Sequence, residues 1–142
     1  EIERREGMSI SQIFGERGEP YFRKKEREVT EELTLVGNMI VSPGGGWVTD
    51  PEMVALVRRH PKLHLDTSAH RGKYLGQRGS GWEMLMQFGN TLIQDKVLVG
   101  LSAGLVSQSY ETLIAEYMKL PLKDTVKEKW LYGNAARVFG LA

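Results

Sequence analysis

Apolar positions along the chain form two kinds of pattern, separated by glycine and proline. Apolar residues spaced three or four apart predict amphipathic helices over residues 21–33, 52–59, 82–94 and 109–119. Apolar runs of strand length, continuous or alternating, cover residues 35–42, 62–68 and 96–102. Because helices and strands alternate, the pattern predicts parallel strands joined by right-handed crossovers.

Local start and stop signals divide the N-terminal part. Ser9 is a favourable N-cap for a short helix that Gly15 and Gly18 end, and Pro20 begins the helix over 21–33. Its apolar stripe is narrow, and the many charges around it, Glu26 among them, are interpreted as a solvated face. Further helices are expected from 123 and after Gly133, whereas residues 69–81, rich in glycine, are predicted to form a loop.

The predicted fold class is α/β, a small three-layer arrangement of about three parallel strands flanked by about six or seven helices. With 142 residues, of which 41% are hydrophobic, the chain is expected to form one domain, 1–142. The continuous apolar strand at 96–101 has few charges to protect its edge, so a homodimer is expected.

Composition and net charge limit the kinds of binding partner and the cellular location that the sequence predicts. The formal net charge is +1, which gives no reason to expect binding to nucleic acid or to an anionic membrane. The chain has no cysteine and no run of about 18 apolar residues, and its first residues are too charged for a signal peptide. We therefore expect a cytoplasmic protein.

One stretch carries candidate chemistry. Gly44, Gly45 and Gly46 follow the predicted strand at 35–42 and precede a helix, and consecutive glycines leave backbone N–H groups open to an anion or a hydroxyl. A tight turn without a ligand is the alternative interpretation. Together with Arg23, these glycines form the candidate ligand-binding site, for a small carboxylate or another small anion.

The first part of the chain resembles shikimate kinase. The resemblance rests on Gly7–Phe14, on Gly18–Glu26 with its Phe-Arg-x-x-Glu, and on Ser42–Trp47, and it covers residues 1–58. It implies that Arg23 grips the substrate carboxylate and that Gly44 to Gly46 approach the ring hydroxyls. The 142 residues contain no G-x-x-x-x-G-K-[ST], the loop that cradles ATP phosphates, so no ATP binding and no cofactor are expected.

The remainder, residues 59–142, resembles the end of a metal-dependent amidohydrolase of the decarboxylase or hydratase type. The closing Gly133–Leu141 stretch, Gly-Asn-Ala-Ala-Arg-x-Phe-Gly-Leu, carries most of this resemblance. In that family an aspartate at the metal would stand where this chain has Ser102. His60, His64 and His70 are the only histidines, and His64 with Asp66 would share one strand face, but no metal site is expected.

Two resemblances in one chain suggest a mosaic of two truncated enzymes, joined near residues 56–61. A chain that also begins without Met suggests an engineered, recombined or generated chimera. The expected function is therefore a folded α/β scaffold without evolved catalytic activity and with no catalytic residues. Two alternatives stay open: a residual shikimate-like module that binds small anions, and an amidohydrolase-like hydrolase or decarboxylase.

Overall fold

The computed structural model describes residues 1–36, 47 and 50–141 of the chain. It divides into two compact units, Glu1–Trp47 and Val48–Ala142. Each unit is described by itself. The predicted strand at 35–42 falls largely outside the described residues, although Leu35 is the last residue of a helix rather than the first of a strand.

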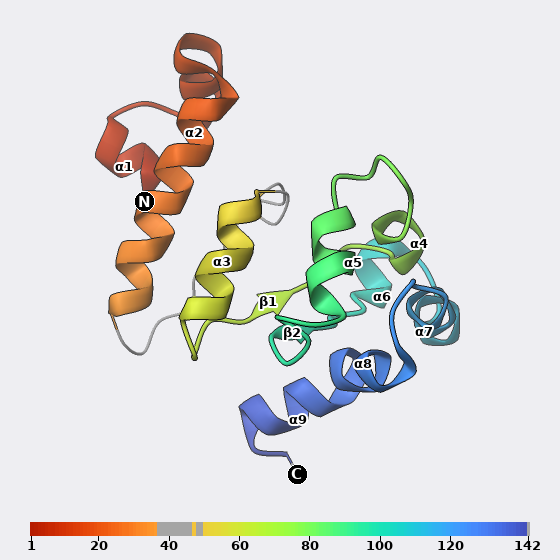
Figure 1. The fold of residues 1–142 in the computed structure, drawn as a ribbon. Coiled ribbons are helices and arrows are strands. Elements are labelled where there is room, and N and C mark those ends of the chain that lie inside the picture. The colour runs from red at the N-terminus through yellow and green to blue at the C-terminus, as the bar shows by residue number, and fades with distance from the viewer. Residues whose placement is uncertain (37–46, 48–49, 142) are drawn as a thin grey trace. The chain divides into compact units, whose positions relative to one another are not determined.

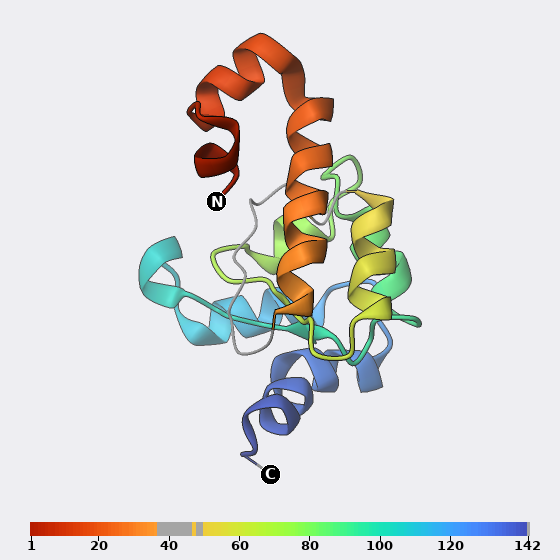
Figure 2. The ribbon, with the colours of Figure 1, turned by 90° about the vertical axis from the view of Figure 1, so that its left-hand side faces the viewer.

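The first unit contains two helices, α1 (Ile2–Glu6) and α2 (Ile10–Leu35). Ser9 caps α2 as predicted, in a capping box in which its hydroxyl accepts from the Gln12 backbone N–H and the Gln12 side chain accepts from the Ser9 backbone N–H. The predicted break is a kink at Gly18, whose φ of 78° is open to glycine at little cost. Figure 2 shows that α2 bends, so that its later part runs back beside α1.

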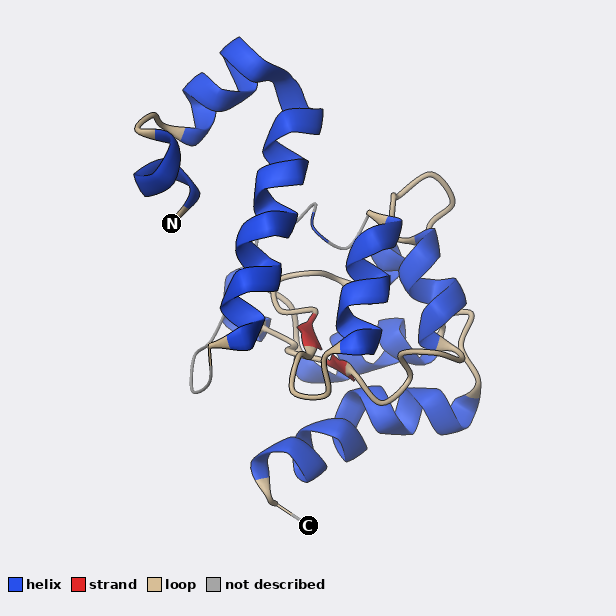
Figure 3. Ribbon diagram, turned by 60° about the vertical axis from the view of Figure 1, so that its left-hand side comes forward, coloured by secondary structure: helices blue, strands red, loops and turns tan. Residues whose placement is uncertain are grey.

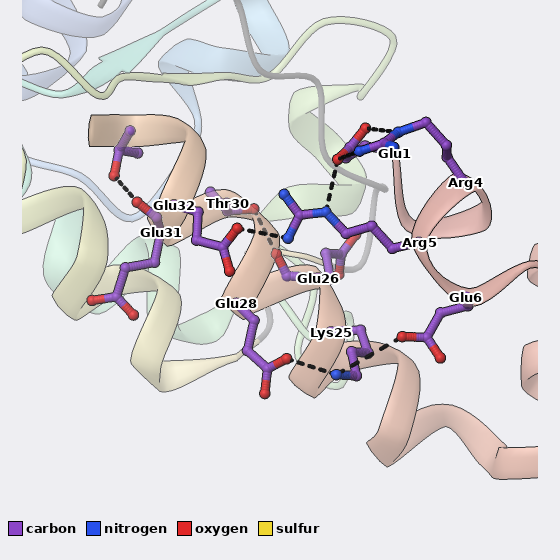
Figure 4. A network of polar contacts seen from close by, with 11 residues as sticks. Glu1, Arg4, Arg5, Glu6, Lys25, Glu26, Glu28, Thr30, Glu31 and Glu32 are labelled. Atoms are coloured by element: carbon purple, nitrogen blue, oxygen red, sulfur yellow. Dashed lines mark hydrogen bonds and ion pairs between the residues drawn. The ribbon is translucent and has the colours of Figure 1, made fainter. Parts of the chain in front are cut away.

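Ion pairs tie α1 to α2. The Arg5 guanidinium donates to Glu1 at 2.7 Å and to Glu32 at 2.6 Å, and Lys25 lies 3.8 Å from Glu6 and 2.9 Å from Glu28 (Figure 4). Several of these side chains are exposed, so each ion pair contributes little to the stability of the unit. The number of pairs, rather than the strength of any one of them, therefore holds α1 against α2.

The second unit is built mainly of helices around a short sheet (Figure 1). Its elements in chain order are α3 (Pro51–Arg59), β1 (Leu65–Asp66), α4 (Gly72–Leu75), α5 (Glu83–Gly89), β2 (Val97–Leu98), α6 (Ala103–Val106), α7 (Tyr110–Met118), α8 (Asp124–Glu128), the π-helix η2 (Lys129–Gly133) and α9 (Asn134–Phe139). Their packed interior is apolar, and its largest fully buried side chains are those of Val57, Leu75, Leu85, Ile93, Val97, Leu113, Tyr117, Val126 and Trp130.

The strands β1 and β2 are parallel, with Leu65 opposite Val97 and Asp66 opposite Leu98 (Figure 3). The prediction of three strands is too high for the described residues, which contain two, and both are shorter than the runs at 62–68 and 96–102. The ladder ends early because the Asp66 carboxylate accepts from the Ser68 backbone N–H, and the Val99 N–H donates to the Trp130 carbonyl.

Two helix predictions also need correction. The helix expected over 82–94 ends at Gly89, because the Gly89 backbone lies directly against the Trp130 ring, and the following residues turn toward β2. The segment 69–81 is not wholly a loop, since it contains α4. Among the described helices, none is long and apolar enough to cross a membrane.

Candidate functional site

Arg23 lies on α2 between two glutamates, one turn away on either side. Its Nε and NH2 groups both donate to one oxygen of Glu19, at 3.2 and 3.0 Å, and its NH1 group donates to Glu26 at 2.7 Å. The guanidinium also lies 5.3 Å from the centroid of the Phe22 ring. Arg23 is thus held in one orientation by the helix that carries it, with part of its surface open to solvent.

The two glutamates differ in burial. The Glu26 side chain is 4% exposed and that of Glu19 is 62% exposed. Burial would lower the pKa of Arg23, but the hydrogen bonds to Glu26 and then Glu19 outweigh it, so the pKa is raised and the guanidinium stays charged. Glu26 thus places a negative charge in a buried position directly beside the Arg23 guanidinium, where an ion pair is screened less than at the surface.

A hydrogen-bonded chain leads from this turn to Trp47. The Thr30 hydroxyl donates to the Glu26 carbonyl at 2.7 Å, and the Trp47 indole N–H donates to the Thr30 hydroxyl at 3.3 Å. Trp47 is buried and directly follows Gly46 in the sequence. Trp47, the residue after the glycine run, is therefore hydrogen-bonded to α2 at Thr30, two turns from Arg23.

Gly44, Gly45 and Gly46 themselves lie outside the described residues. The structure thus brings Trp47 to the helix of Arg23, while the predicted approach of the glycines to a ligand stays a prediction.

The geometry of Arg23 suits a carboxylate. A guanidinium offers parallel N–H groups that match the two oxygens of a carboxylate, and such paired bonds are stronger than neutral ones. Here one guanidinium faces two carboxylates, so the three side chains together carry one negative charge. An anionic ligand must therefore compete with a glutamate for Arg23.

The candidates of the second unit do not form one site. The His64 ring Nδ1 is 3.1 Å from the Lys62 carbonyl, and the His70 ring contacts Trp82 and the Ser68 carbonyl. Asp66 accepts from the Ser68 hydroxyl at 2.5 Å.

Ser102, in a left-handed conformation with φ of 49°, accepts from the Ala69 backbone N–H at 3.1 Å. Among the described side chains, no three of the His, Asp and Glu type group closely enough to hold a metal. The expectation of no metal site stays a prediction.

Sequence reasoning missed Glu26 and Thr30 as part of the site. Both lie on the buried stripe of α2 with Phe22 and Val29, at successive spacings of four, three and one residues. The signal was present, since a glutamate at an apolar position four residues after Phe22 and three before Val29 should be buried. Three residues after an arginine, it should also be paired with that arginine.

Comparison with known proteins identifies relatives of the part of the chain that contains α2. The sequence pattern of the family described as shikimate kinase matches residues 1–78. The bifunctional shikimate kinase/3-dehydroquinate synthase of Thermotoga maritima is 51% identical over 65 residues, 46% of this chain and 13% of that protein. A shikimate kinase of Dehalococcoides mccartyi is 49% identical over 57 residues, 40% of this chain and 32% of that protein.

A third relative extends the similarity across nearly the whole chain. The shikimate kinase of Thermus thermophilus is 30% identical over 137 residues, which are 94% of this chain and 74% of that protein. No solved structure matches the chain significantly. The chain thus spans 13% of the Thermotoga protein, 32% of the Dehalococcoides protein and 74% of the Thermus protein.

These findings correct three expectations. Both the family pattern and the Thermus relative continue through residues 56–61, where a mosaic would have its junction, so the interpretation as an engineered chimera is wrong. The amidohydrolase-like assignment of residues 59–142 is wrong for the same reason, because the shikimate kinase of Thermus thermophilus aligns over 94% of the chain and so covers this part as well. The expected function, a scaffold without evolved activity, is also wrong, because the matching family and the relatives are shikimate kinases. With a matching pattern over residues 1–78 and a relative aligned over 137 residues, the chain belongs to the shikimate kinase family.

Proposed function

We propose that this chain acts in shikimate phosphorylation and that its part in the reaction is to bind shikimate through Arg23. The single observation that supports this best is the orientation of Arg23 on α2, where one N–H group is held by the buried Glu26 and the other N–H edge faces the exposed Glu19. Shikimate is a ring carboxylate with hydroxyl groups, so an arginine with a fixed N–H edge recognises its charged end.

Phosphoryl transfer also requires a loop that holds the nucleotide phosphates. No G-x-x-x-x-G-K-[ST] occurs in these 142 residues, so the proposal assigns them the acceptor substrate rather than the nucleotide. Gly44, Gly45 and Gly46 are assigned to the hydroxylated side of the ring, where backbone N–H groups donate without a side chain in the way.

Titration calorimetry of the chain with shikimate tests the proposal. Arg23→Lys keeps the charge but loses the paired N–H geometry, and we expect about 10- to 100-fold weaker binding, since a hydrogen bond to a charged group is worth about 1.5–3 kcal/mol. Arg4→Lys is the matched control, because Arg4 pairs with Glu1 and its side chain is 73% exposed.

Circular dichroism is the check that both variants keep their helices. Undetectable binding of shikimate by the parent chain at millimolar concentration would overturn the proposal. Equal binding by the parent and Arg23→Lys would show that Arg23 does not bind the shikimate carboxylate.

A further inference from the structure

Arg23 has two edges that can receive a carboxylate, and they are not equally available. Glu26 accepts from one N–H group of Arg23 at 2.7 Å and is almost wholly buried, so an incoming ligand can displace it only by separating a buried carboxylate from the arginine charge beside it. The other edge, formed by Nε and NH2, faces Glu19. A ligand that takes two parallel N–H bonds from Arg23 has to take them from this edge.

The hydrogen bonds between Glu19 and that edge of Arg23 are weak enough for a ligand to break. Both N–H groups donate to the same oxygen, Oε1, at 3.2 and 3.0 Å, so one acceptor serves two donors and the bonds are longer than those of a well-formed pair. The Glu19 side chain is 62% exposed, and such pairs contribute little net free energy. Glu19 can turn into solvent, whereas Glu26 cannot.

The charges of Arg23, Glu19 and Glu26 also indicate that Glu19 moves away when a ligand carboxylate binds. With both glutamates in place, the local sum is one positive against two negative charges, which repels a further carboxylate. When Glu19 turns away, Arg23 and Glu26 balance each other, and the ligand carboxylate restores the arrangement seen here with two oxygens instead of one.

We propose that Glu19 is an internal stand-in for the substrate carboxylate, occupying the Nε and NH2 edge of Arg23 until a carboxylate ligand displaces it. This inference rests on the proposed function, since it concerns the same arginine. It makes Glu19 a residue that sets affinity and selectivity: only a ligand whose carboxylate binds the edge better than one glutamate oxygen is retained, and neutral ring compounds gain nothing from displacing it.

The test measures the binding of shikimate and of its methyl ester to the full chain and to Glu19→Gln. We expect the dissociation constant for shikimate to fall by about two- to fivefold in Glu19→Gln, as removal of an exposed competing pair allows. Binding of the uncharged ester should be the same in both. Glu28→Gln is the matched control, because it removes the same charge from α2 but pairs with Lys24 and Lys25.

The outcomes separate this inference from the function on which it rests. Shikimate binding that is unchanged or weaker in Glu19→Gln and in Glu19→Ala would overturn the role of Glu19 and leave the proposed function standing. An equal gain in Glu28→Gln would also overturn it, because the effect would then be one of net charge. If neither the parent nor the two Glu19 variants bind shikimate, both proposals fail together.

Discussion

Gly89 tests whether the interior of the second unit is as closely packed as the structure indicates. It is the last residue of α5, and an added Cβ would lie 2.3 Å from Cζ2 and 2.8 Å from Cη2 of Trp130. The Trp130 side chain is 1% exposed, so its ring has no free space into which to turn. We therefore expect Gly89→Ala to destabilise the protein, although alanine is the better helix former.

The magnitude follows from two opposing effects. Contact between carbon atoms is optimal at about 3.5–4 Å, so α5 or Trp130 has to move by about 1 Å or more. Overpacking of this kind costs about 1–3 kcal/mol, whereas replacing glycine in a helix gains at most about 1 kcal/mol. The net expectation is a loss of about 1–2 kcal/mol, or a melting temperature lower by about 4–8 °C.

Thermal and urea unfolding followed by circular dichroism measure this change. Gly15→Ala is the control, because Gly15 is also helical but nothing lies within 4 Å of its added Cβ, so it should stabilise by up to about 1 kcal/mol. Adding Trp130→Phe should make Gly89→Ala less costly, since the two sites are in contact. A Gly89→Ala protein as stable as the parent would refute the reasoning.

Three further predictions concern pH and association. Burial, followed by the charges of Lys96 and Arg137, lowers the pKa of His64 from 6.5 despite the Lys62 carbonyl, so stability present above pH 6.5 is lost as the pH falls below it. Unfolding midpoints between pH 7.5 and 5.5 should therefore decline less in His64→Gln, and parallel curves would contradict this. Burial raises the pKa of Tyr117 to about 12, against the hydrogen bond from Thr67, so stability should fall as the pH rises above about 10, where the unfolded tyrosine ionises. Tyr117→Phe should lack that alkaline decline, and urea midpoints at pH 9 and 11 measure it. The homodimer remains a prediction from the apolar strand at 96–101: light scattering at tens of micromolar should give twice the chain mass of 16.0 kDa, and the monomer mass would count against it.

The sequence alone placed the helices with clear local signals. Ser9 and Ser109 accept from the backbone N–H three residues later, and Asp50 accepts from that of Glu52, at the starts of α2, α7 and α3. The kink at Gly18 before Pro20 also follows from its own neighbourhood. These features depend on interactions within a few residues, which a linear pattern contains. The candidate Arg23 came from the resemblance to shikimate kinase, and its role in binding stays a prediction.

Other features were decided only by contacts between distant parts of the chain. The strands at 65–66 and 97–98 are short because a carboxylate and the Trp130 carbonyl intercept the next backbone groups, 31 residues beyond Val99 in the second case. α5 ends where Gly89 meets the same tryptophan. Apolar runs give the sequence a preference for strand, but pairing partners fix the length.

Glu26 shows the same division most clearly. Its position among charged residues suggested a solvated face, whereas the fold buries it beside Phe22 and Val29 and pairs it with Arg23. Composition gives the charge of a residue but not its dielectric surroundings. The tertiary structure decides those surroundings, because burial makes one glutamate a fixed partner of Arg23 and exposure leaves the other, Glu19, free to be displaced.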